Sequence, residues 1–323
     1  MAYKIILTAK QGEDRQKWIS VRNKGIGGSD AGAILGLNSY KKPYELWLEK
    51  TGAKEPEDIS EKEAVKAGVY LEPVVARWFT DETGKKVQRK GTMQSMENPF
   101  MIANIDRWVV GENAGLEIKT AGFFSGKLWD EDEIPDSYYC QCLHYMAVSG
   151  ADRWYIAALI GGQRFIWKTI ERNEEDIKAL IEKEREFWHL VETGTAPDID
   201  ASKSCADALQ FKYKDAVKDS ETELPKEAGD LFQEYDDITG QLDELKEKES
   251  LIKNKMMDLL QTNEVGIWYN PAGGKRKATW KAPKASESIK LSDIKKQDMN
   301  EYGRLKAKGF ITVREATRRL RIY

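Results

Sequence analysis

The amino-acid sequence predicts an α/β fold in which a mixed central β-sheet is flanked by helices, followed by a different C-terminal region. Three observations predict it. Helical and strand-like hydrophobic patterns alternate over the first 200 residues, which is typical of one α/β domain. Hydrophobic residues make up 41% of the 323-residue chain, enough for a packed core. After residue 200 the pattern changes to a heptad repeat, which indicates a separate helical region.

The first local signal is a glycine-rich segment, RNKGIGGSDAGAILG, from Arg22 to Gly36. Its glycines permit tight backbone turns. Ser29 or Asp30 can cap the helix that follows, because short polar side chains accept hydrogen bonds from free backbone N–H groups at helix starts. A second short helix is expected from about Pro43 to Thr51, where apolar residues cluster.

A long helix is predicted over 61–84, where apolar residues recur with a roughly helical period. Pro73 falls within this pattern, so it should either kink the helix or begin a new one at Glu72. Residues 54–60 are polar and are expected to link this helix to the preceding one.

Strand-like runs follow at 86–95 and 100–104. A β-hairpin is then predicted from IDRWVV (105–110) and GLEIKT (115–120), because the joining sequence GENAG is rich in turn-forming residues. In a strand, residues two apart point to the same face.

The rest of the first region alternates helix and strand. A helix is predicted from Asp136 to Gly150, with Asp136 or Ser137 as its cap. Strands are expected at 153–159 and 164–170, separated by two glycines. Asn173 should cap a helix that runs to about Thr193.

These patterns divide the chain into a domain over 1–200 and a C-terminal extension over 201–323. In the extension, apolar residues follow alternating steps of four and three, with Glu249 as the single break. This heptad seam fits either a short coiled coil or an αα-hairpin interrupted near Gly240. The seam consists of Leu231, Tyr235, Ile238, Leu242, Leu245, Ile252, Met256 and Leu259.

The end of the chain is basic. Two strands are expected at 265–269 and 277–281, and the sequence ends in the basic run ATRRLRIY. Residues 264–323 contain 15 Lys or Arg and 6 Asp or Glu, so they carry +9, while residues 1–263 carry −12 of the net −3. A basic tail on an acidic body suggests contact with a polyanion, although a solvated lysine-rich tail is the alternative.

Composition also excludes some classes. The chain lacks an apolar run of about 18 residues, so we expect no membrane span. The N-terminus has no secretory pattern. Three cysteines do not make a disulfide framework in a chain of this length. A location in a reducing cytoplasm fits best.

Asp106, Glu117 and Lys119 form the central chemical constellation. Glu117 and Lys119 share one face of a predicted strand, and Asp106 lies on the preceding strand of the hairpin. Two carboxylates supply the hard oxygen ligands that Mg²⁺ prefers, and a lysine offsets charge that develops on a phosphate. A strand Glu-x-Lys alone usually marks a solvated face, so the flanking sequence must decide.

The flanking sequence resembles the phage lambda exonuclease family, including the YqaJ-type viral recombinases, within the PD-(D/E)xK nuclease superfamily. The four matches occur in the family order and span Arg22 to about Pro197. They are RNKGIGGSDAGAILG, GVYLEPVVARWF, the pair IANIDRWV and GLEIKT, and YYCQCLHYM. Each match is weak by itself, but the ordered set is specific. The resemblance implies a restriction-endonuclease-like α/β fold.

The resemblance implies a role for each residue of the metal site. Asp106 and Glu117 match the metal-binding carboxylates, and the Ile118 carbonyl would add a ligand. Glu72 matches a helix glutamate that approaches the same metal, and Lys119 matches the catalytic lysine. The implied cofactor is Mg²⁺, for which Mn²⁺ is expected to substitute. The proline that precedes the aspartate in the superfamily name is replaced here by isoleucine.

Other matched residues concern the DNA end. Arg22 and Ser29 match residues that hold the terminal 5′-phosphate, which suits a guanidinium and a hydroxyl near a helix start. Gln141 matches a glutamine near the active site, where it would bind phosphate or the attacking water. Asn104 stands where the family has a phosphate-binding serine, and Leu143 stands where relatives often carry a second glutamine. His144, on the same helix, is interpreted as structural.

The resemblance implies a 5′-to-3′ exonuclease that acts on linear double-stranded DNA ends, releases mononucleotides and leaves 3′ single strands. It also implies a homo-oligomer, a trimeric ring, a phage single-strand annealing protein as partner, and the cytoplasm of a bacterial host as the location. With DNA as the substrate, we expect the extension over 201–323 to serve assembly, partner binding or DNA contact. Two alternatives remain open at this point. One is an endonuclease of the same superfamily, and the other is a non-catalytic DNA-binding or assembly protein with a vestigial metal site.

Overall fold

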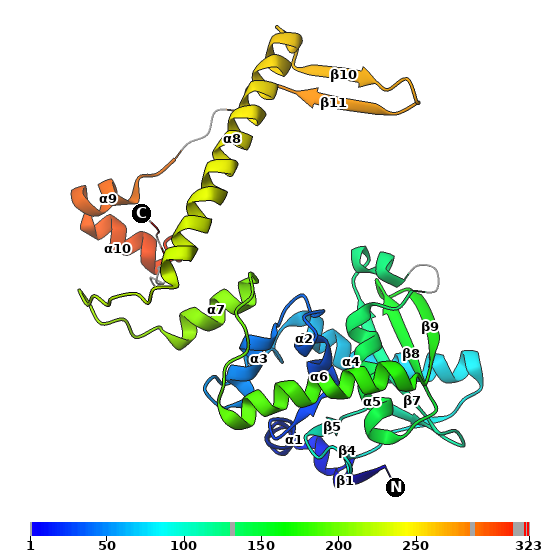
Figure 1. The fold of residues 1–323 in the computed structure, drawn as a ribbon. Coiled ribbons are helices and arrows are strands. Elements are labelled where there is room, and N and C mark those ends of the chain that lie inside the picture. The colour runs from blue at the N-terminus through cyan, green and yellow to red at the C-terminus, as the bar shows by residue number, and fades with distance from the viewer. Residues whose placement is uncertain (1, 130–132, 285–287, 313–319, 321, 323) are drawn as a thin grey trace. The chain divides into compact units, whose positions relative to one another are not determined.

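The computed structural model describes residues 2–129, 133–284, 288–312, 320 and 322. The chain forms two compact units, Met1–Lys214 and Asp215–Tyr323 (Figure 1). The sequence predicts a boundary near residue 200, and the first unit extends further because helix α7 (Lys203–Lys212) packs on it. Ser204 of α7 donates a hydrogen bond of 2.6 Å to the Glu45 carboxylate in helix α3 (Pro43–Lys50).

A five-stranded sheet forms the centre of the first unit. Its order is β3 (Val87–Gln88), β6 (Arg107–Val109), β7 (Ala114–Ala121), β8 (Arg153–Ile160) and β9 (Arg164–Glu171). Strand β7 is antiparallel to β6 and parallel to β8, while all other neighbours are antiparallel. The predicted mixed central sheet and its β6–β7 hairpin are therefore confirmed.

Helices cover both faces of this sheet (Figure 1). Helix α4 (Glu63–Thr83) packs its apolar side on Leu116 and Ile118 of β7. Helix α5 (Asp136–Ser149) lies on the opposite face, toward which Glu117 and Lys119 point. The alternation of side chains along β7 thus separates an apolar core from a polar site.

A second sheet of four strands is built from the N-terminal segments. Its order is β1 (Tyr3–Leu7), β4 (Thr92–Ser95), β5 (Met101–Ala103) and β2 (Ile26–Gly27). The single strand predicted over 86–95 is wrong, because this segment splits into β3 and β4, which belong to different sheets. The chain changes sheets near Gly91, where a Cβ atom would lie 2.3 Å from the Leu7 carbonyl oxygen.

Three short helices follow β1 in the chain. They are η1 (Gln11–Glu13), α1 (Arg15–Arg22) and α2 (Gly28–Ile34). Gly27 is the N-cap residue of α2, and its N–H donates a hydrogen bond of 3.0 Å to the Asp30 carboxylate. Asp30 therefore caps α2 by reaching back from inside the helix, while Ser29 is a helical residue.

Two predicted helix boundaries differ from the structure. Helix α4 continues through Pro73, so a new helix does not begin at Glu72. Helix α5 begins after Pro135 and has no side-chain cap, so neither Asp136 nor Ser137 serves as one. By contrast, Asn173 caps helix α6 (Glu174–Thr193) as predicted, accepting two backbone hydrogen bonds.

The second unit is organised around helix α8 (Ala228–Leu260), which is unbroken at Gly240. Of the two alternatives that the heptad seam left open, the αα-hairpin interrupted near Gly240 is therefore wrong. A hairpin follows, formed by β10 (Val265–Tyr269) and β11 (Lys275–Thr279), which begins two residues earlier than predicted.

Two short helices, α9 (Leu291–Gln297) and α10 (Met299–Ala307), lie beyond the hairpin. Of the basic run at 316–323, all but Leu320 and Ile322 lie outside the described residues. None of the helices that the structure describes is both long and apolar enough to cross a membrane.

Candidate active site

Glu117, Lys119 and Gln141 form the centre of the site. The Lys119 ammonium lies 2.6 Å from Glu117 Oε1 and donates to Gln141 Oε1 at 2.9 Å. Gln141 Nε2 donates to Glu117 Oε1 at 2.7 Å and to the Tyr145 hydroxyl at 2.8 Å. The i, i+4 spacing of Gln141 and Tyr145 on α5 places both on one helix face, as predicted. The sheet and the helix thus hold the lysine and the carboxylate in one closed network.

Asp106 joins this centre from the residue just before β6. Its Oδ2 accepts a hydrogen bond of 2.7 Å from the Ile118 N–H, between Glu117 and Lys119 on β7. Burial and the nearby Glu117 charge raise the pKa of Asp106 well above its ordinary value. Two carboxyl groups this close repel each other when both are ionised. A cation between them would relieve that repulsion.

Lys119 is held as a cation. Burial by itself would lower its pKa, but the carboxylates of Glu117 and Asp106 outweigh burial, so the pKa of Lys119 is raised above its ordinary value. Its ammonium also lies 4.6 Å from the ring centre of Tyr138, on α5. The charged form of Lys119 is therefore available to neutralise negative charge on a bound group.

Glu72 faces the same region from α4. Its carboxylate forms an ion pair with the buried Arg107, whose guanidinium also donates to the Asp106 carbonyl oxygen at 2.7 Å. A cleft of about 340 Å³ opens beside these residues. Its walls include Trp18, Glu72, Arg89, Asn104, Asp106 and Arg107. Asp106 thus connects the buried network to an open cleft.

The carboxylates fit a divalent cation in part. Glu117 Oε2 is buried and has no hydrogen-bond partner among the described residues, which is costly unless another group satisfies it. Within the described parts of the chain, no three Asp, Glu, His or Cys side chains gather closely enough to form a metal-binding group. Mg²⁺ commonly uses one or two protein carboxylates and keeps several waters. Asp106 and Glu117 meet that requirement, while Glu72 is turned toward Arg107.

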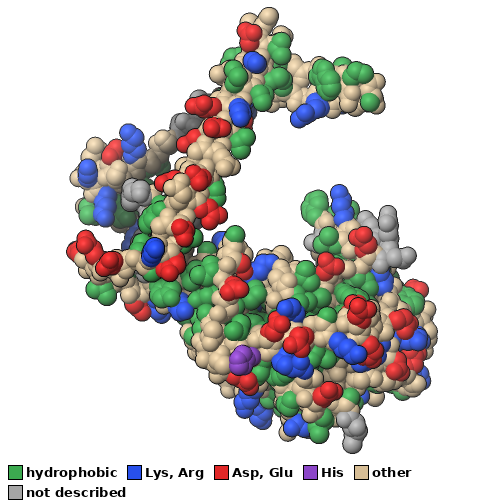
Figure 2. Space-filling model, in the orientation of Figure 1, with side chains coloured by type: hydrophobic (Ala, Val, Ile, Leu, Met, Phe, Trp, Pro, Cys, Tyr) green, Lys and Arg blue, Asp and Glu red, His purple; other side chains and the backbone are tan. Residues whose placement is uncertain are grey.

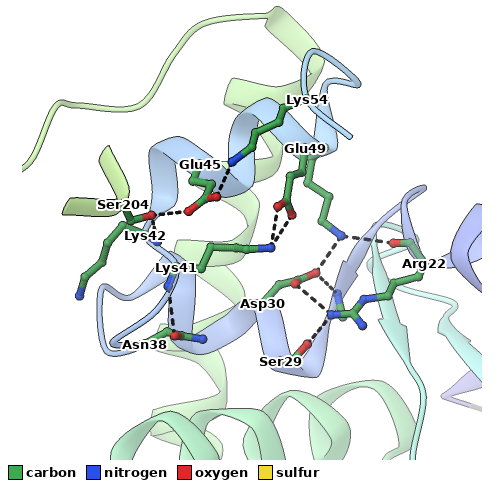
Figure 3. Close-up of polar contacts among 12 residues, drawn as sticks. Arg22, Ser29, Asp30, Asn38, Lys41, Lys42, Glu45, Glu49, Lys54 and Ser204 are labelled. Carbon is green, nitrogen blue, oxygen red and sulfur yellow. Dashed lines mark hydrogen bonds and ion pairs between the residues drawn. The ribbon is translucent and has the colours of Figure 1, made fainter. Parts of the chain in front are cut away.

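Arg22 and Ser29 lie together, as the family resemblance implies. Arg22 donates to the Ser29 hydroxyl at 2.7 Å and stands 3.6 Å from the buried Asp30 carboxylate (Figure 3). Its guanidinium also lies 5.1 Å from the ring centre of Trp18, which lines the cleft. The guanidinium is one third exposed and is already oriented by three neighbours.

Asp30 anchors this corner of the molecule. The buried Lys50 ammonium lies 2.8 Å from Asp30 and donates to the Gly25 carbonyl oxygen at 2.7 Å. Burial alone would raise the pKa of Asp30, but Lys50 and Arg22 outweigh it and hold that pKa well below its ordinary value. A negative charge beneath Arg22 fixes its position and leaves its outer face for an anion.

The third predicted phosphate-binding residue, Asn104, lies in the wall of the cleft. Its Oδ1 accepts a hydrogen bond of 2.6 Å from the Thr92 hydroxyl. The amide Nδ2 is then the atom that can donate to a phosphate oxygen.

The two groups of residues are joined by a close contact. A Cβ atom on Gly28, next to Ser29, would lie 2.5 Å from the Tyr145 ring. Only glycine therefore fits beneath that ring. Tyr145 in turn holds Gln141 through its hydroxyl. The start of α2 and the Glu117–Lys119 centre thus rest on the same tyrosine.

His144 is structural, as interpreted from the sequence. Its ring is fully buried, with Nδ1 2.8 Å from Glu184 of α6 and Nε2 3.0 Å from the Ile102 carbonyl oxygen. Burial alone would lower the pKa of His144, but Glu184 outweighs it and raises that pKa. The pair connects α5, α6 and β5 and has no exposed face for DNA.

Sequence reasoning missed three residues of the site. Arg107 had a signal, since it is the one basic residue in the run IDRWVV. Lys50 and Tyr138 had none, because each meets its partner only through the fold. All three place a charge or a ring against a predicted site residue.

Comparison with known proteins identifies the family to which the chain belongs. Residues 17–152 match the profile described as the YqaJ-like viral recombinase domain, a span that contains every predicted site residue from Arg22 to Gln141. The chain is also 39% identical over 303 residues to the uncharacterized protein YqaJ of Bacillus subtilis (strain 168), covering 92% of this chain and 93% of that protein. The chain belongs to the YqaJ-like viral recombinase family, which confirms the assignment from its motifs.

Solved structures with some similarity are described as exonucleases. An alkaline exonuclease from Laribacter hongkongensis is 18% identical, with a TM-score of 0.49, and the match covers 56% of this chain and 94% of that one. A putative exonuclease from Eubacterium rectale is 12% identical, with a TM-score of 0.42, and the match covers 71% and 98%.

Proposed function

We propose that this protein is a Mg²⁺-dependent exonuclease that digests linear double-stranded DNA from its 5′ ends. It would release mononucleotides and leave 3′ single strands for recombination by annealing. One observation carries the proposal. Asp106, Glu117 and Lys119 come from two neighbouring strand segments and converge beside a cleft that Asp106 lines, with a buried Glu117 oxygen that lacks a hydrogen-bond partner among the described residues.

Asp106, Glu117 and the Ile118 carbonyl would hold the metal ion. Glu72 would join them after exchanging its ion pair with Arg107. When bound, Mg²⁺ or Mn²⁺ polarises the phosphodiester and favours ionisation of water.

The chain's own residues have separate tasks in this reaction. Lys119, held in its charged form, stabilises negative charge on the scissile phosphate. Gln141 orients Lys119 and Glu117 by bonding both, and would give up one bond to a phosphate oxygen or a water. Tyr145 keeps Gln141 in place.

Arg22, Ser29 and Asn104 would bind the terminal 5′-phosphate. A guanidinium donates in a fixed fork that matches phosphate oxygens. Because Asp30 and Trp18 already orient Arg22, little side-chain entropy remains to be lost on binding. This pocket is the feature that favours an exonuclease over an endonuclease, since only a strand end offers a terminal phosphate.

Assembly belongs to the same proposal. The exposed heptad stripe of α8 would join copies of the chain into a homo-oligomer, for which a trimeric ring is the expectation. The expected partner is a phage single-strand annealing protein that coats the exposed 3′ strand. Sedimentation of a chain ending at Lys214 beside the full chain tests the first point, because the shorter chain should be the smaller assembly.

The decisive test uses linear duplex DNA labelled at either the 5′ or the 3′ end, with Mg²⁺ and a closed circular duplex alongside. Immediate release of the 5′ label as mononucleotide, with the circle intact, is the expected result. Cutting of the circle would move the protein to the endonuclease class. If no substrate were cut with Mg²⁺ or Mn²⁺, the site would be vestigial and the protein a DNA-binding or assembly protein.

A further inference from the structure

The β10–β11 hairpin exposes large aromatic side chains. Trp268, Tyr269 and Trp280 keep 57%, 69% and 51% of their surfaces accessible in the described chain. The second unit offers little to cover them, because Leu260 and Ile311 are the only buried hydrophobic residues in the part of 215–323 that the structure describes. Exposed aromatics of this size usually mark a binding surface.

The strand register pairs these rings with cations. Trp268 lies directly opposite Arg276, and Tyr269 directly opposite Lys275, in the two pairs nearest the turn. Adjacent pairs point to opposite faces of a two-stranded ribbon. Each face of the hairpin tip therefore carries one ring beside one positive charge.

The charge around the tip has one sign. Residues 265–284 contain five Lys or Arg and no Asp or Glu, whereas α8 contains nine Asp or Glu and four Lys or Arg. Figure 2 shows this contrast, with acidic side chains along the helix and hydrophobic and basic side chains on the hairpin. Acidic residues are thus absent from the hairpin segment where basic residues are dense. A polyanion complements that distribution.

We propose that the tip of the β10–β11 hairpin is a binding site for single-stranded DNA. Trp268 and Tyr269 stack on unpaired bases, and Lys275, Arg276 and Lys277 contact phosphates. Stacking on exposed rings requires bases that are not already stacked in a duplex. Protein interfaces are also rich in Trp, Tyr and Arg, but they are depleted of lysine, and residues 265–284 contain four lysines. The inference stands on the second unit alone and does not rest on the proposed nuclease activity.

The test is fluorescence anisotropy with the full chain, a labelled oligothymidine and a duplex of equal length, without divalent metal. Trp268→Ala and Tyr269→Ala should each weaken oligothymidine binding roughly 5- to 150-fold, the equivalent of 1–3 kcal/mol per stacked base. Trp268→Phe keeps a ring and should restore most of the affinity. Tyr40→Ala, which removes an exposed tyrosine of the first unit, is the matched control and should leave binding unchanged.

The salt dependence of oligothymidine binding tests the role of the positive charges. Replacing Lys275, Arg276 and Lys277 by alanine should reduce the slope of log affinity against log salt by about 2, since each single-strand phosphate contact contributes about 0.7. Replacing Lys246, Lys248 and Lys253 of α8 is the matched control. Unchanged oligothymidine binding in the hairpin variants, or equal loss in the α8 variants, would overturn the proposal.

Two further outcomes would give the hairpin tip a different role and would also overturn the proposal. Equal affinity for the duplex, lost equally in the variants, would make it a duplex-binding ribbon. A fall in sedimenting mass for Trp268→Ala, with oligothymidine binding intact, would make it a contact between copies of the chain.

Discussion

The two units of the chain differ in how far they bury their apolar side chains. The first buries them in three clusters around α4, α5 and α6, and also buries charged residues such as Glu117 and Glu184. The second exposes a stripe along α8, including Leu242 and Leu245, and buries almost none of its described apolar residues. The first unit therefore contains the contacts that stabilise it, whereas the second leaves an apolar stripe exposed.

This difference teaches what a hydrophobic pattern can predict. The heptad steps of α8 and the alternation of β7 are equally regular in the sequence. In β7 the apolar residues meet α4 within the same chain. In α8 they stay exposed among the residues that the structure describes. A pattern identifies the apolar face, but only the fold shows whether the chain covers it.

The largest expected effect is on catalysis, which should depend on Lys119 in the first unit and not on an exposed lysine of the second. Lys119→Ala should slow digestion of linear duplex DNA by about 10²- to 10³-fold, because a preorganised charge at the phosphate is lost. Lys246→Ala, an exposed lysine on α8, is the matched control and should retain full activity. The rate of 5′-label release measures both. Equal activity of the two variants would remove Lys119 from the mechanism.

The next expected effect concerns buried charge. Asp30→Asn should lower the free energy of unfolding at pH 7 by about 3–5 kcal/mol, because Lys50 would keep a buried charge without its partner. The exposed Asp237→Asn on α8 should leave stability unchanged. Chemical denaturation of the three proteins measures these differences.

The same substitution predicts a pH dependence. The folded-state pKa of Asp30 lies below its ordinary value of 3.8, so the unfolded chain takes up this proton first. The stabilisation is present above about pH 4 and is lost as the pH falls further. The stability gap between wild type and Asp30→Asn should therefore narrow in acid. A gap that stays constant down to pH 2 would show that the Asp30 charge is not its source.

A third comparison uses two leucines. Leu116→Ala should cost about 2–5 kcal/mol of stability, because Leu116 is fully buried. Leu242→Ala should cost less than about 0.5 kcal/mol in dilute solution, but should reduce the sedimenting mass at higher concentration. Thermal unfolding and sedimentation measure the two effects. A large stability loss at Leu242 in dilute solution would show that α8 is covered within one chain.

The smallest expected effect concerns the DNA end. Arg22→Ala should weaken digestion of 5′-phosphorylated ends by roughly 10- to 100-fold, the value of a hydrogen bond to a charged group. Digestion of 5′-hydroxyl ends should change far less. Comparing both substrates with wild type and variant measures the ratio. Equal loss on both would remove the 5′-phosphate pocket.

Much of the first unit could be predicted from its sequence, because its signals are local. The β6–β7 hairpin, the caps of α2 and α6, and the Gln141–Tyr145 pair each depend on residues a few positions apart. The split of 86–95 into two strands could not be predicted, because it depends on how Gly91 meets the Leu7 backbone.

The charge pairs show the same limit. Arg107 meets Glu72 and Lys50 meets Asp30 only after the helices dock. The family resemblance placed Glu72 among the metal ligands, whereas in the fold its carboxylate forms an ion pair with Arg107. Pairing of charges that lie 35 and 20 positions apart depends on topology, which local spacing does not contain.

The contact between Gly28 and Tyr145 has a consequence for product size. If the first unit cuts as proposed, Ser29, which follows Gly28, binds the terminal phosphate. The Glu117–Lys119 centre, which Tyr145 contacts through Gln141, then acts on the next phosphate. Because a Cβ atom on Gly28 would already lie 2.5 Å from the Tyr145 ring, there is little room for the two to approach each other. The contact therefore sets a minimum distance between the 5′-phosphate site and the proposed cutting site, and this minimum should not depend on the bases of the strand.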